Sequence, residues 1–305
     1  MERVLMEQKL KRKASIKAGW DDITLSCIAY GISGFFAIIC FMPFLYVIKY
    51  SLSPYESYLK NPFSLIPDQL TTAAYKMALG YQYIWSGYKN TLFISFAGTA
   101  CAMTLLVLTA YPLSKNDFKG RRFIMTLWVI TMFFNGGTIP NYFLIRSLGL
   151  LNNLWAMILP GLLGAFNLIL MINYIKDLPT SIEEAALIDG ANDMQVLIRV
   201  VLPLCLPILA TLGLFTIVGF WNTYFSAIIY LTKRQMWPLQ LVLREIVFES
   251  GANEMQQGME AEERVTQPFI LKMASIVIAT LPIMCVYPFL QKYFMTGLVL
   301  GGVKE

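Results

Sequence analysis

The spacing that is most suggestive of chemistry lies between residues 176 and 203, where hydroxyl and acidic side chains recur at helical intervals. Thr180 or Ser181, followed three residues later by Glu183 or Glu184, has the form of a capping box. In such a box, side chains satisfy the free N–H groups at the start of a helix. We therefore expect a helix that begins near residue 180 and carries carboxylates on its surface.

The sequence also predicts where this helix ends and that a second helix follows it. Gly190 is placed to stop it, because glycine adopts the left-handed conformation that ends helices. A second short helix, from Asn192 to about Val201, then leads into Pro203. The pattern predicts a compact helix–turn–helix, small enough to fit a groove on another protein.

The chain offers few of the side chains that catalysis commonly uses. The chain contains no histidine, which removes histidine-based triads, histidine metal ligands and imidazole proton shuttles. Five scattered cysteines form no C-x-x-C pair and read as small buried hydrophobes: Cys27, Cys40, Cys101, Cys205 and Cys285. No catalytic constellation and no metal site is predicted, so we expect a protein that is not an enzyme.

Composition places these features in a membrane. Of the 305 residues, 57% are hydrophobic and 14% are charged, against roughly a quarter charged in soluble domains. Crossing the bilayer takes about 20 apolar residues. The stretches that qualify are 23–49, 90–113, 123–145, 154–175, 201–231 and 269–291. The predicted fold is all-α, a polytopic membrane protein with six transmembrane helices.

Some of these spans carry helix-breaking residues. Gly136, Gly137 and Pro140 loosen the end of the third span, and Pro207 lies early in the fifth. Proline inside a helix removes a hydrogen bond and kinks the helix. The alternative is that these prolines only reflect the higher frequency of proline in membrane helices.

Basic residues set the expected orientation. The N-terminal tail and the loop 115–122 are rich in lysine and arginine, so both lie in the cytoplasm by the positive-inside rule. Both termini and the loop 176–203 are then cytoplasmic, and the acidic loop 232–268 faces outward. The net charge of +5 flanks apolar segments, which argues against a nucleic-acid partner.

Three parts of the chain follow from this topology. Residues 1–85 hold the cytoplasmic tail, the first span and an extracellular loop. Residues 86–291 form a core of five spans that includes the loop 176–203. Residues 292–305 form a cytoplasmic tail.

The energy source is expected to lie in another subunit. The centres of the predicted spans carry no charged residue, whereas proton-coupled carriers generally use ionisable groups within the membrane. No G-x-x-x-x-G-K-[ST] motif is present to cradle ATP phosphates. Sodium coupling through carbonyls and hydroxyls stays open. A self-sufficient secondary carrier or channel is therefore the alternative.

The loop 176–203 carries a specific resemblance. Glu184, Ala185, Ala186, Gly190 and the pair 202–203 (Leu202-Pro203) match the E-A-A-x3-G-x9-I-x-L-P signature of binding-protein-dependent ABC transporter permeases, with Val200 in place of isoleucine. The resemblance implies that this loop is the coupling helix of a type I importer permease and docks on an ATPase. It further implies that Glu184 makes the polar contact, the two alanines pack closely and Gly190 forms the turn.

Further stretches resemble the carbohydrate-uptake branch, within which the chain is similar to the smaller, six-span partner of the maltose-type pair. These stretches are 133–140, 149–156, 184–193 and 220–226. Asn135-Gly-Gly137 and 239–246 most resemble permeases for complex oligosaccharides, including alginate and pectic fragments.

This resemblance implies a set of partners. They are a second homologous permease, two copies of an ABC ATPase, an extracellular solute-binding protein and an oligosaccharide substrate in the bilayer of a bacterial plasma membrane. ATP and Mg²⁺ would be bound by the ATPase, and this chain would hold no cofactor.

The amides and aromatic residues within the spans are candidates for the translocation path. Sugars are bound by aromatic faces and side-chain amides, because a pyranose has an apolar face and a rim of hydroxyls. The candidates are Asn135, Asn167, Trp221, Asn222 and Tyr224. The competing explanation is hydrogen bonding between helices together with packed or lipid-facing aromatic side chains.

Overall fold

The computed structural model describes residues 20–60, 64, 67, 69–256 and 269–285, and every regular element within these ranges is a helix. The elements are α2 (Trp20–Ser51), α3 (Tyr55–Lys60), α4 (Ala73–Leu79), α5 (Ile84–Ser114), α6 (Arg121–Phe133), α7 (Thr138–Ser147), α8 (Trp155–Ile158), η1 (Leu159–Gly161), α9 (Ala165–Lys176), α10 (Thr180–Ile188), α11 (Asp193–Val196), η2 (Leu197–Val201), α12 (Leu202–Leu204), α13 (Leu206–Trp221), α14 (Phe225–Tyr230), η3 (Arg234–Met236), α15 (Leu239–Gln256) and the helix Phe269–Cys285. The all-α prediction is confirmed. The predicted basic tail and the tail 292–305 lie outside the described residues.

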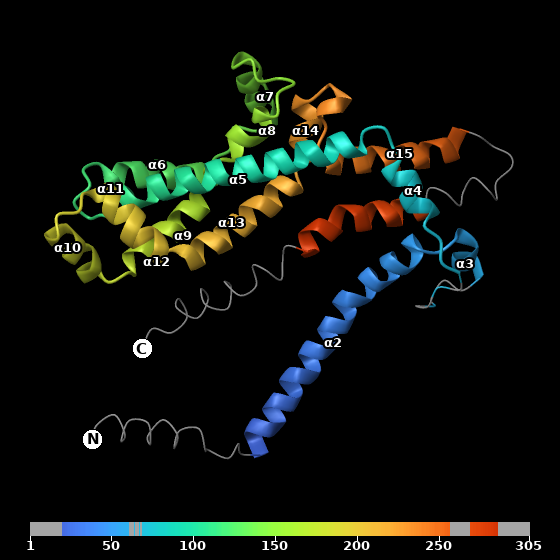
Figure 1. Cartoon of the computed structure of the whole chain (residues 1–305), viewed down its shortest axis with the longest axis horizontal. Coiled ribbons are helices and arrows are strands. Elements are labelled where there is room, and N and C mark those ends of the chain that lie inside the picture. Colours follow the sequence, from blue (N-terminus) through green and yellow to red (C-terminus); the bar gives the residue numbers. More distant parts are fainter. Residues whose placement is uncertain (1–19, 61–63, 65–66, 68, 257–268, 286–305) are drawn as a thin grey trace.

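Helix α5 is the axis of the bundle. It packs against α13, α9 and α15, and it runs along most of the molecule's long axis (Figure 1). At 31 residues and 1.5 Å per residue, its length is about 46 Å, enough to cross a bilayer. The short helices α10 and α11 lie at one end of this axis, and α15 lies toward the other (Figure 1).

Three buried clusters include residues of α5, and the two larger ones lie at different heights along it. Near α10 and α11, side chains of α5, α9, η2 and α13 form the larger core, which includes Leu106, Leu168, Met171 and Leu212. Farther along, α5 meets α8, α13 and α14 in a second cluster around Ile94. Both lack charged residues, so hydrophobic burial and close packing hold these helices together.

A glycine on α5 permits the closest approach to α13. A Cβ atom added at Gly98 would lie 2.8 Å from the Phe220 ring, and Phe220 is 7% exposed. Gly98→Val should therefore lower the thermal unfolding temperature in detergent, at a cost of about 1–3 kcal/mol for overpacking. Gly213→Ala on α13 is the matched control, because its nearest neighbour atom is 3.9 Å away. Equal unfolding temperatures for the two variants would contradict this packing account.

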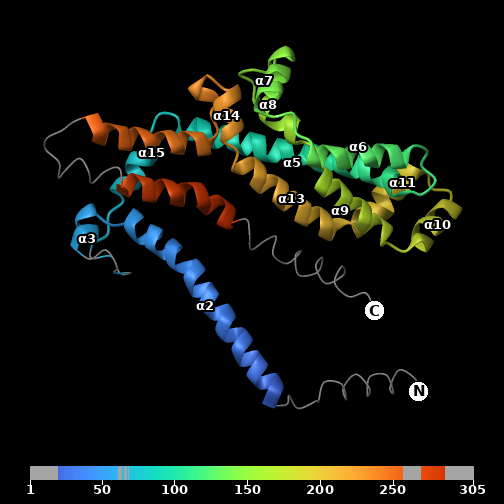
Figure 2. The same cartoon turned by 180° about the vertical axis from the view of Figure 1, so that it is seen from behind.

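Helix α2 stands apart from the bundle. It diverges from the other helices in both views and approaches them only near its C-terminal end (Figures 1 and 2). The most apolar 18-residue stretch of Thr24–Ser51 contains no buried residue. Lys49 and Tyr50, at the C-terminal end of the helix, are buried. A long apolar helix with an unburied surface is suited to lipid or to a partner helix.

Three predicted spans are bent rather than straight. The paired segments Arg121–Phe133 and Thr138–Ser147 meet at 119°, Trp155–Gly161 and Ala165–Lys176 at 52°, and Asp193–Leu204 and Leu206–Trp221 at 79°. In the described residues, two helices are long and apolar enough to cross a membrane, or five spans if each bent pair counts as one. The helix Phe269–Cys285 is shorter. The number six stays a prediction.

The bends follow from the breaker residues. Between α6 and α7, Gly137 has φ of 86°, and its N–H donates to the Asn135 side chain at 2.9 Å. Pro207, in the first turn of α13, has no N–H to continue the preceding helix. The predicted disruptions at Gly136–Pro140 and at Pro207 are thus confirmed as breaks. The end of α13 at Trp221, before the separate α14, was not predicted.

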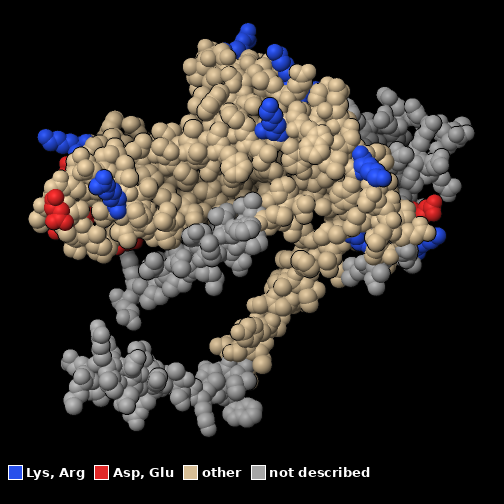
Figure 3. Space-filling view, viewed as in Figure 1, with Lys and Arg blue, Asp and Glu red and all other residues tan. Residues whose placement is uncertain are grey.

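Charge is unevenly distributed over the molecule. On the visible face, most acidic side chains gather around α10 and α11, and the stretch between that end and the part carrying α7, α14 and α15 has almost no charge of either sign (Figure 3). This uncharged belt matches the expected hydrocarbon-facing region, since charged groups are costly there.

Candidate functional site: the α10–α11 loop and a polar groove

The start of α10 differs from the sequence prediction. The helix begins at Thr180 directly after Pro179, and no side chain hydrogen-bonds its first N–H groups, so the predicted capping box is wrong. The capping box of this loop lies at α11 instead. There the Asn192 side chain accepts from the Gln195 N–H, and the Gln195 side chain accepts from the Asn192 N–H, both at 2.9 Å.

Gly190 forms the turn between the two helices, as predicted. Its φ is +87°, a region that residues with a Cβ atom rarely adopt. Its N–H donates to the Leu187 carbonyl, and the Ala191 N–H donates to the Ala186 carbonyl, each at 3.0 Å. These bonds close the last turn of α10 and aim the chain at α11.

This loop exposes large apolar side chains beside its acidic ones. Ile188 is 85% exposed, and four further large apolar side chains in α10, α11 and η2 are exposed as well: Ile182, Leu187, Met194 and Ile198. Helix α10 itself has no buried residue. Exposed large apolar side chains gathered in one short loop are suited to contact with another protein.

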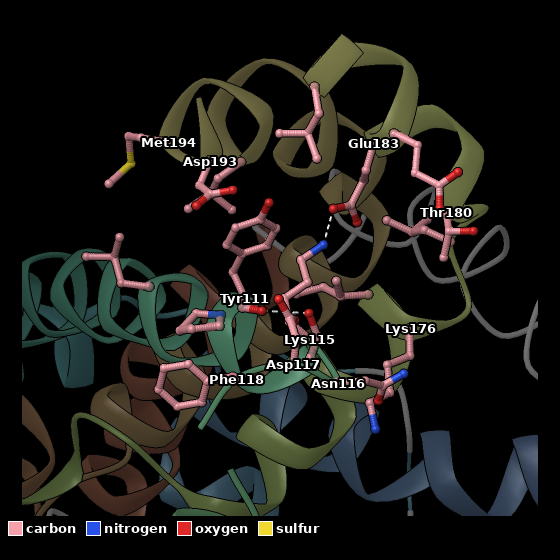
Figure 4. Close-up of a pocket in the computed structure, with 18 residues that line it drawn as sticks. Tyr111, Lys115, Asn116, Asp117, Phe118, Lys176, Thr180, Glu183, Asp193 and Met194 are labelled. Atoms are coloured by element: carbon pink, nitrogen blue, oxygen red, sulfur yellow. Dashed lines mark hydrogen bonds and ion pairs between the residues drawn. The ribbon is translucent and has the colours of Figure 1, made fainter. Parts of the chain in front are cut away.

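The inner side of α10 is tied to α5. Lys115, which caps α5, donates from its Nζ to the Glu183 carboxylate in an ion pair (Figure 4). The Glu183 side chain is 14% exposed. The Lys115 ammonium also lies 4.6 Å from the centre of the Tyr111 ring. The pair lines a cleft of about 770 Å³ between α5 and the α10–α11 loop. A partly buried ion pair of this kind couples the position of α10 to that of α5.

Reversing one charge of this pair should uncouple the two helices. Lys115→Glu or Glu183→Lys brings like charges together, and we expect ATP-driven uptake to fall by about tenfold. The double variant, Lys115→Glu with Glu183→Lys, restores the pair and should recover most of the uptake. Lys176→Glu is the control, since Lys176 is an exposed lysine in the same cleft. Additive losses in the double variant would contradict a direct link.

The other residues predicted from the coupling signature divide between surface and core. Glu184 and Ala185 are exposed on α10, whereas Ala186 is half-buried and packs against the larger core. In α12, Leu202 packs against that core and Pro203 is exposed. The signature thus has an exposed part at 184–185, of which Glu184 also lines the cleft, and a part at Ala186 and Leu202 that anchors the loop to the bundle.

A second candidate site is a groove with polar side chains between α13 and the segments α7, α8, the start of α9 and α14. Its volume is about 470 Å³. Asn167, one of the predicted path residues, lines it. Four further polar side chains line the groove and were missed: Asn141, Thr216, Thr223 and Ser226. Uncharged polar groups facing an open path are suited to the hydroxyls of a sugar.

The other predicted path residues lie outside this groove. Trp221 is 6% exposed, and its indole N–H donates to the Ala279 carbonyl at 3.1 Å. Asn222 and Tyr224 are exposed beside the groove's end, and Asn135 lies exposed in the break between α6 and α7. The structure therefore gathers Asn167 with residues that were not predicted, and the role of Trp221 in the path stays a prediction.

A helical pattern could have found part of the groove. Thr216 and Gly219 lie at i and i+3 on α13 and share one face, and Thr223 follows two residues after the helix ends. Small and hydroxyl residues at that spacing indicate a polar stripe on an otherwise apolar helix. Lys115 offered no such signal, because it is 68 residues away from Glu183.

The sequence is similar to that of a transport permease and to one further bacterial protein. The chain is 43% identical over 282 residues to the polygalacturonan/rhamnogalacturonan transport system permease protein YtcP of Bacillus subtilis, covering 91% of this chain and 97% of that protein. It is 40% identical over 271 residues to protein LplC of the same organism, covering 87% and 90%.

A solved structure supports the same fold. The crystal structure of a bacterial ABC transporter involved in the import of the acidic polysaccharide alginate contains a chain that is 31% identical, with a TM-score of 0.79, covering 92% of this chain and 100% of that one.

A family model describes nearly the whole length as well, matching residues 28–298. This chain belongs to the binding-protein-dependent transport system inner membrane component family.

Proposed function

We propose that this chain is one of two membrane subunits of an ATP-driven importer and that its cargo is an acidic oligosaccharide of the pectin or alginate type. The observation that carries the importer role is the α10–α11 loop, in which a family signature coincides with exposed apolar side chains at one end of the bundle. The acidic cargo is supported by the relatives named above, which transport polygalacturonan, rhamnogalacturonan and alginate.

The proposed assembly contains a second permease, two ATPase subunits and an extracellular binding protein. A face for the second permease is available on α6 and α7. Helix α6 has no buried residue, and Phe133 and Phe134 at its end are 77% and 76% exposed. ATP and Mg²⁺ bind to the ATPase subunits, which dock on the outward surface of the α10–α11 loop.

The proposed orientation puts α10 and both termini in the cytoplasm of a bacterial cell. The α14–α15 end then faces outward, where the binding protein delivers the cargo. The uncharged stretch between the two ends (Figure 3) fits the hydrocarbon region in this orientation.

Transport in this scheme is alternating access. Closure of the ATPase pair moves α10, and the ion pair of Lys115 with Glu183 passes that movement to α5. Because α5 packs on α13 and α9, its movement changes the groove that holds Asn167 and Thr216. The groove opens outward to receive the sugar and inward to release it.

Reconstitution tests this function directly. The chain is placed in liposomes with the second permease, the ATPase and the binding protein, and uptake of labelled trigalacturonate is measured. We expect uptake only when ATP and all subunits are present. Uptake by the chain alone, without ATP, would support a self-sufficient carrier or channel and overturn the importer assignment.

A further inference from the structure

An exposed polar and aromatic strip lies where α13 ends and α14 begins. Asn222 and Tyr224 lie in the break between the two helices and are exposed. Opposite them, on α15, are Gln240 and Arg244, four residues apart and so on one face. The Gln240 amide donates to the Asn222 side chain at 3.4 Å. The strip adjoins the groove along the chain, because Thr223 and Ser226, which line the groove, are sequence neighbours of Asn222 and Tyr224.

Arg244 is held in place by aromatic rings. Its guanidinium lies 4.9 Å from the centre of the Tyr224 ring and 5.1 Å from that of Phe248. Such cation–π contacts fix the position of the group. They leave its N–H donors free of any carboxylate, and among the described residues Arg244 has no ion pair.

The nearest acid in the sequence is already engaged. Glu245 forms an ion pair with Arg234 at 2.7 Å and accepts a hydrogen bond from the Tyr81 hydroxyl at 3.1 Å. Its charge is therefore compensated by Arg234 and does not neutralise Arg244. The strip presents a fixed positive charge at the outer end of an otherwise uncharged groove.

Guanidinium, aromatic ring and amide form a set that matches one ligand class. A uronic acid residue has an apolar ring face, a rim of hydroxyls and one carboxylate. Aromatic rings pack on the apolar face, and amides hydrogen-bond to the hydroxyls. A guanidinium binds the carboxylate with two parallel hydrogen bonds.

We propose that Arg244, with Tyr224, Asn222 and Gln240, is a carboxylate-recognition subsite that admits acidic oligosaccharides into the groove and discriminates against neutral ones. This inference rests on the proposed function and adds a specificity-determining residue to it. Arg244 contacts the cargo's carboxylate, while Tyr224 and Phe248 orient the guanidinium.

The test uses the complete transporter in liposomes with two labelled probes, trigalacturonate and its methyl ester, which has the same sugar rings without the charge. Arg244→Gln should reduce trigalacturonate uptake by about tenfold, because it removes a charge-assisted contact. Uptake of the methyl ester should be unchanged, which also shows that the variant is folded and assembled. Arg244→Lys keeps the charge but loses the planar fork, so its trigalacturonate uptake should lie between those of the wild type and Arg244→Gln. Lys233→Gln removes an exposed charge nearby and should match the wild type.

Salt provides a second measurement that does not need the methyl ester. From about 50 mM to about 250 mM KCl, trigalacturonate uptake should weaken more in the wild type than in Arg244→Gln, because the variant lacks the screened charge. Equal salt dependence, or an equal loss for both probes, overturns the subsite while the importer role stands. If the wild type takes up neither probe with ATP present, the proposed function fails and this inference with it.

Discussion

Replacing Gly190 with proline should abolish uptake while the chain still inserts in the membrane. Gly190 has φ of +87°, whereas the proline ring fixes φ near −65°. Proline also removes the N–H that donates to the Leu187 carbonyl at 3.0 Å. The turn cannot form, so α10 and α11 lose their relative orientation and the docking surface proposed for the ATPase is lost. We expect uptake to fall by about a hundredfold or more, because a disrupted turn costs about 3 kcal/mol.

Two controls separate this effect from misfolding. Gly190→Asn should retain much of the uptake, since asparagine tolerates the left-handed region better than other residues with a Cβ atom. The space around Gly190 is open, so a side chain there meets strain and no clash. Membrane insertion is measured by the yield of the purified chain, and coupling by ATP-driven uptake. Wild-type uptake in Gly190→Pro would contradict the role of this turn.

Local features of the sequence predicted the parts of the fold that depend on near neighbours. The turn at Gly190 and the breaks at Gly137 and Pro207 follow from backbone preferences of single residues, and the structure places all three as those preferences require. The sequence also predicted α2 and α5, because each contains an apolar stretch long enough to cross a membrane. The size of each bend depends on packing between helices and could not be read from the chain.

Contacts between segments that are distant in the chain could not be predicted from the sequence. The carboxylate at Glu183 was assigned to a local capping box because the hydroxyls at 180–181 are close in sequence. Lys115 competes for that carboxylate from 68 residues away, and a charged partner is favoured over a backbone cap when the pair is partly buried. Trp221 was likewise assigned to the path by residue type, whereas its neighbour in the structure is the helix Phe269–Cys285.

The last prediction concerns two adjacent carboxylates with opposite roles. Glu183 points inward and pairs with Lys115, whereas Glu184 is exposed, and its carboxylate has no hydrogen bond or ion pair within the described residues. Glu184→Lys should therefore leave the fold of this chain intact and act only on its partner. Reversing a charge at a protein interface costs several kcal/mol, so we expect uptake to fall by about a hundredfold or more.

The two positions give distinguishable results in the same assays. For Glu184→Lys, the thermal unfolding temperature of the chain should equal that of the wild type, and the ATPase should no longer co-purify with the membrane subunits. For Glu183→Lys, uptake should be recovered when Lys115→Glu is added, because the partner lies in this chain. No second substitution in this chain should rescue Glu184→Lys; rescue should come only from a compensating acidic substitution on the ATPase. If Glu184→Lys is rescued by Lys115→Glu, or if it transports at the wild-type rate, Glu184 is not the contact to the ATPase.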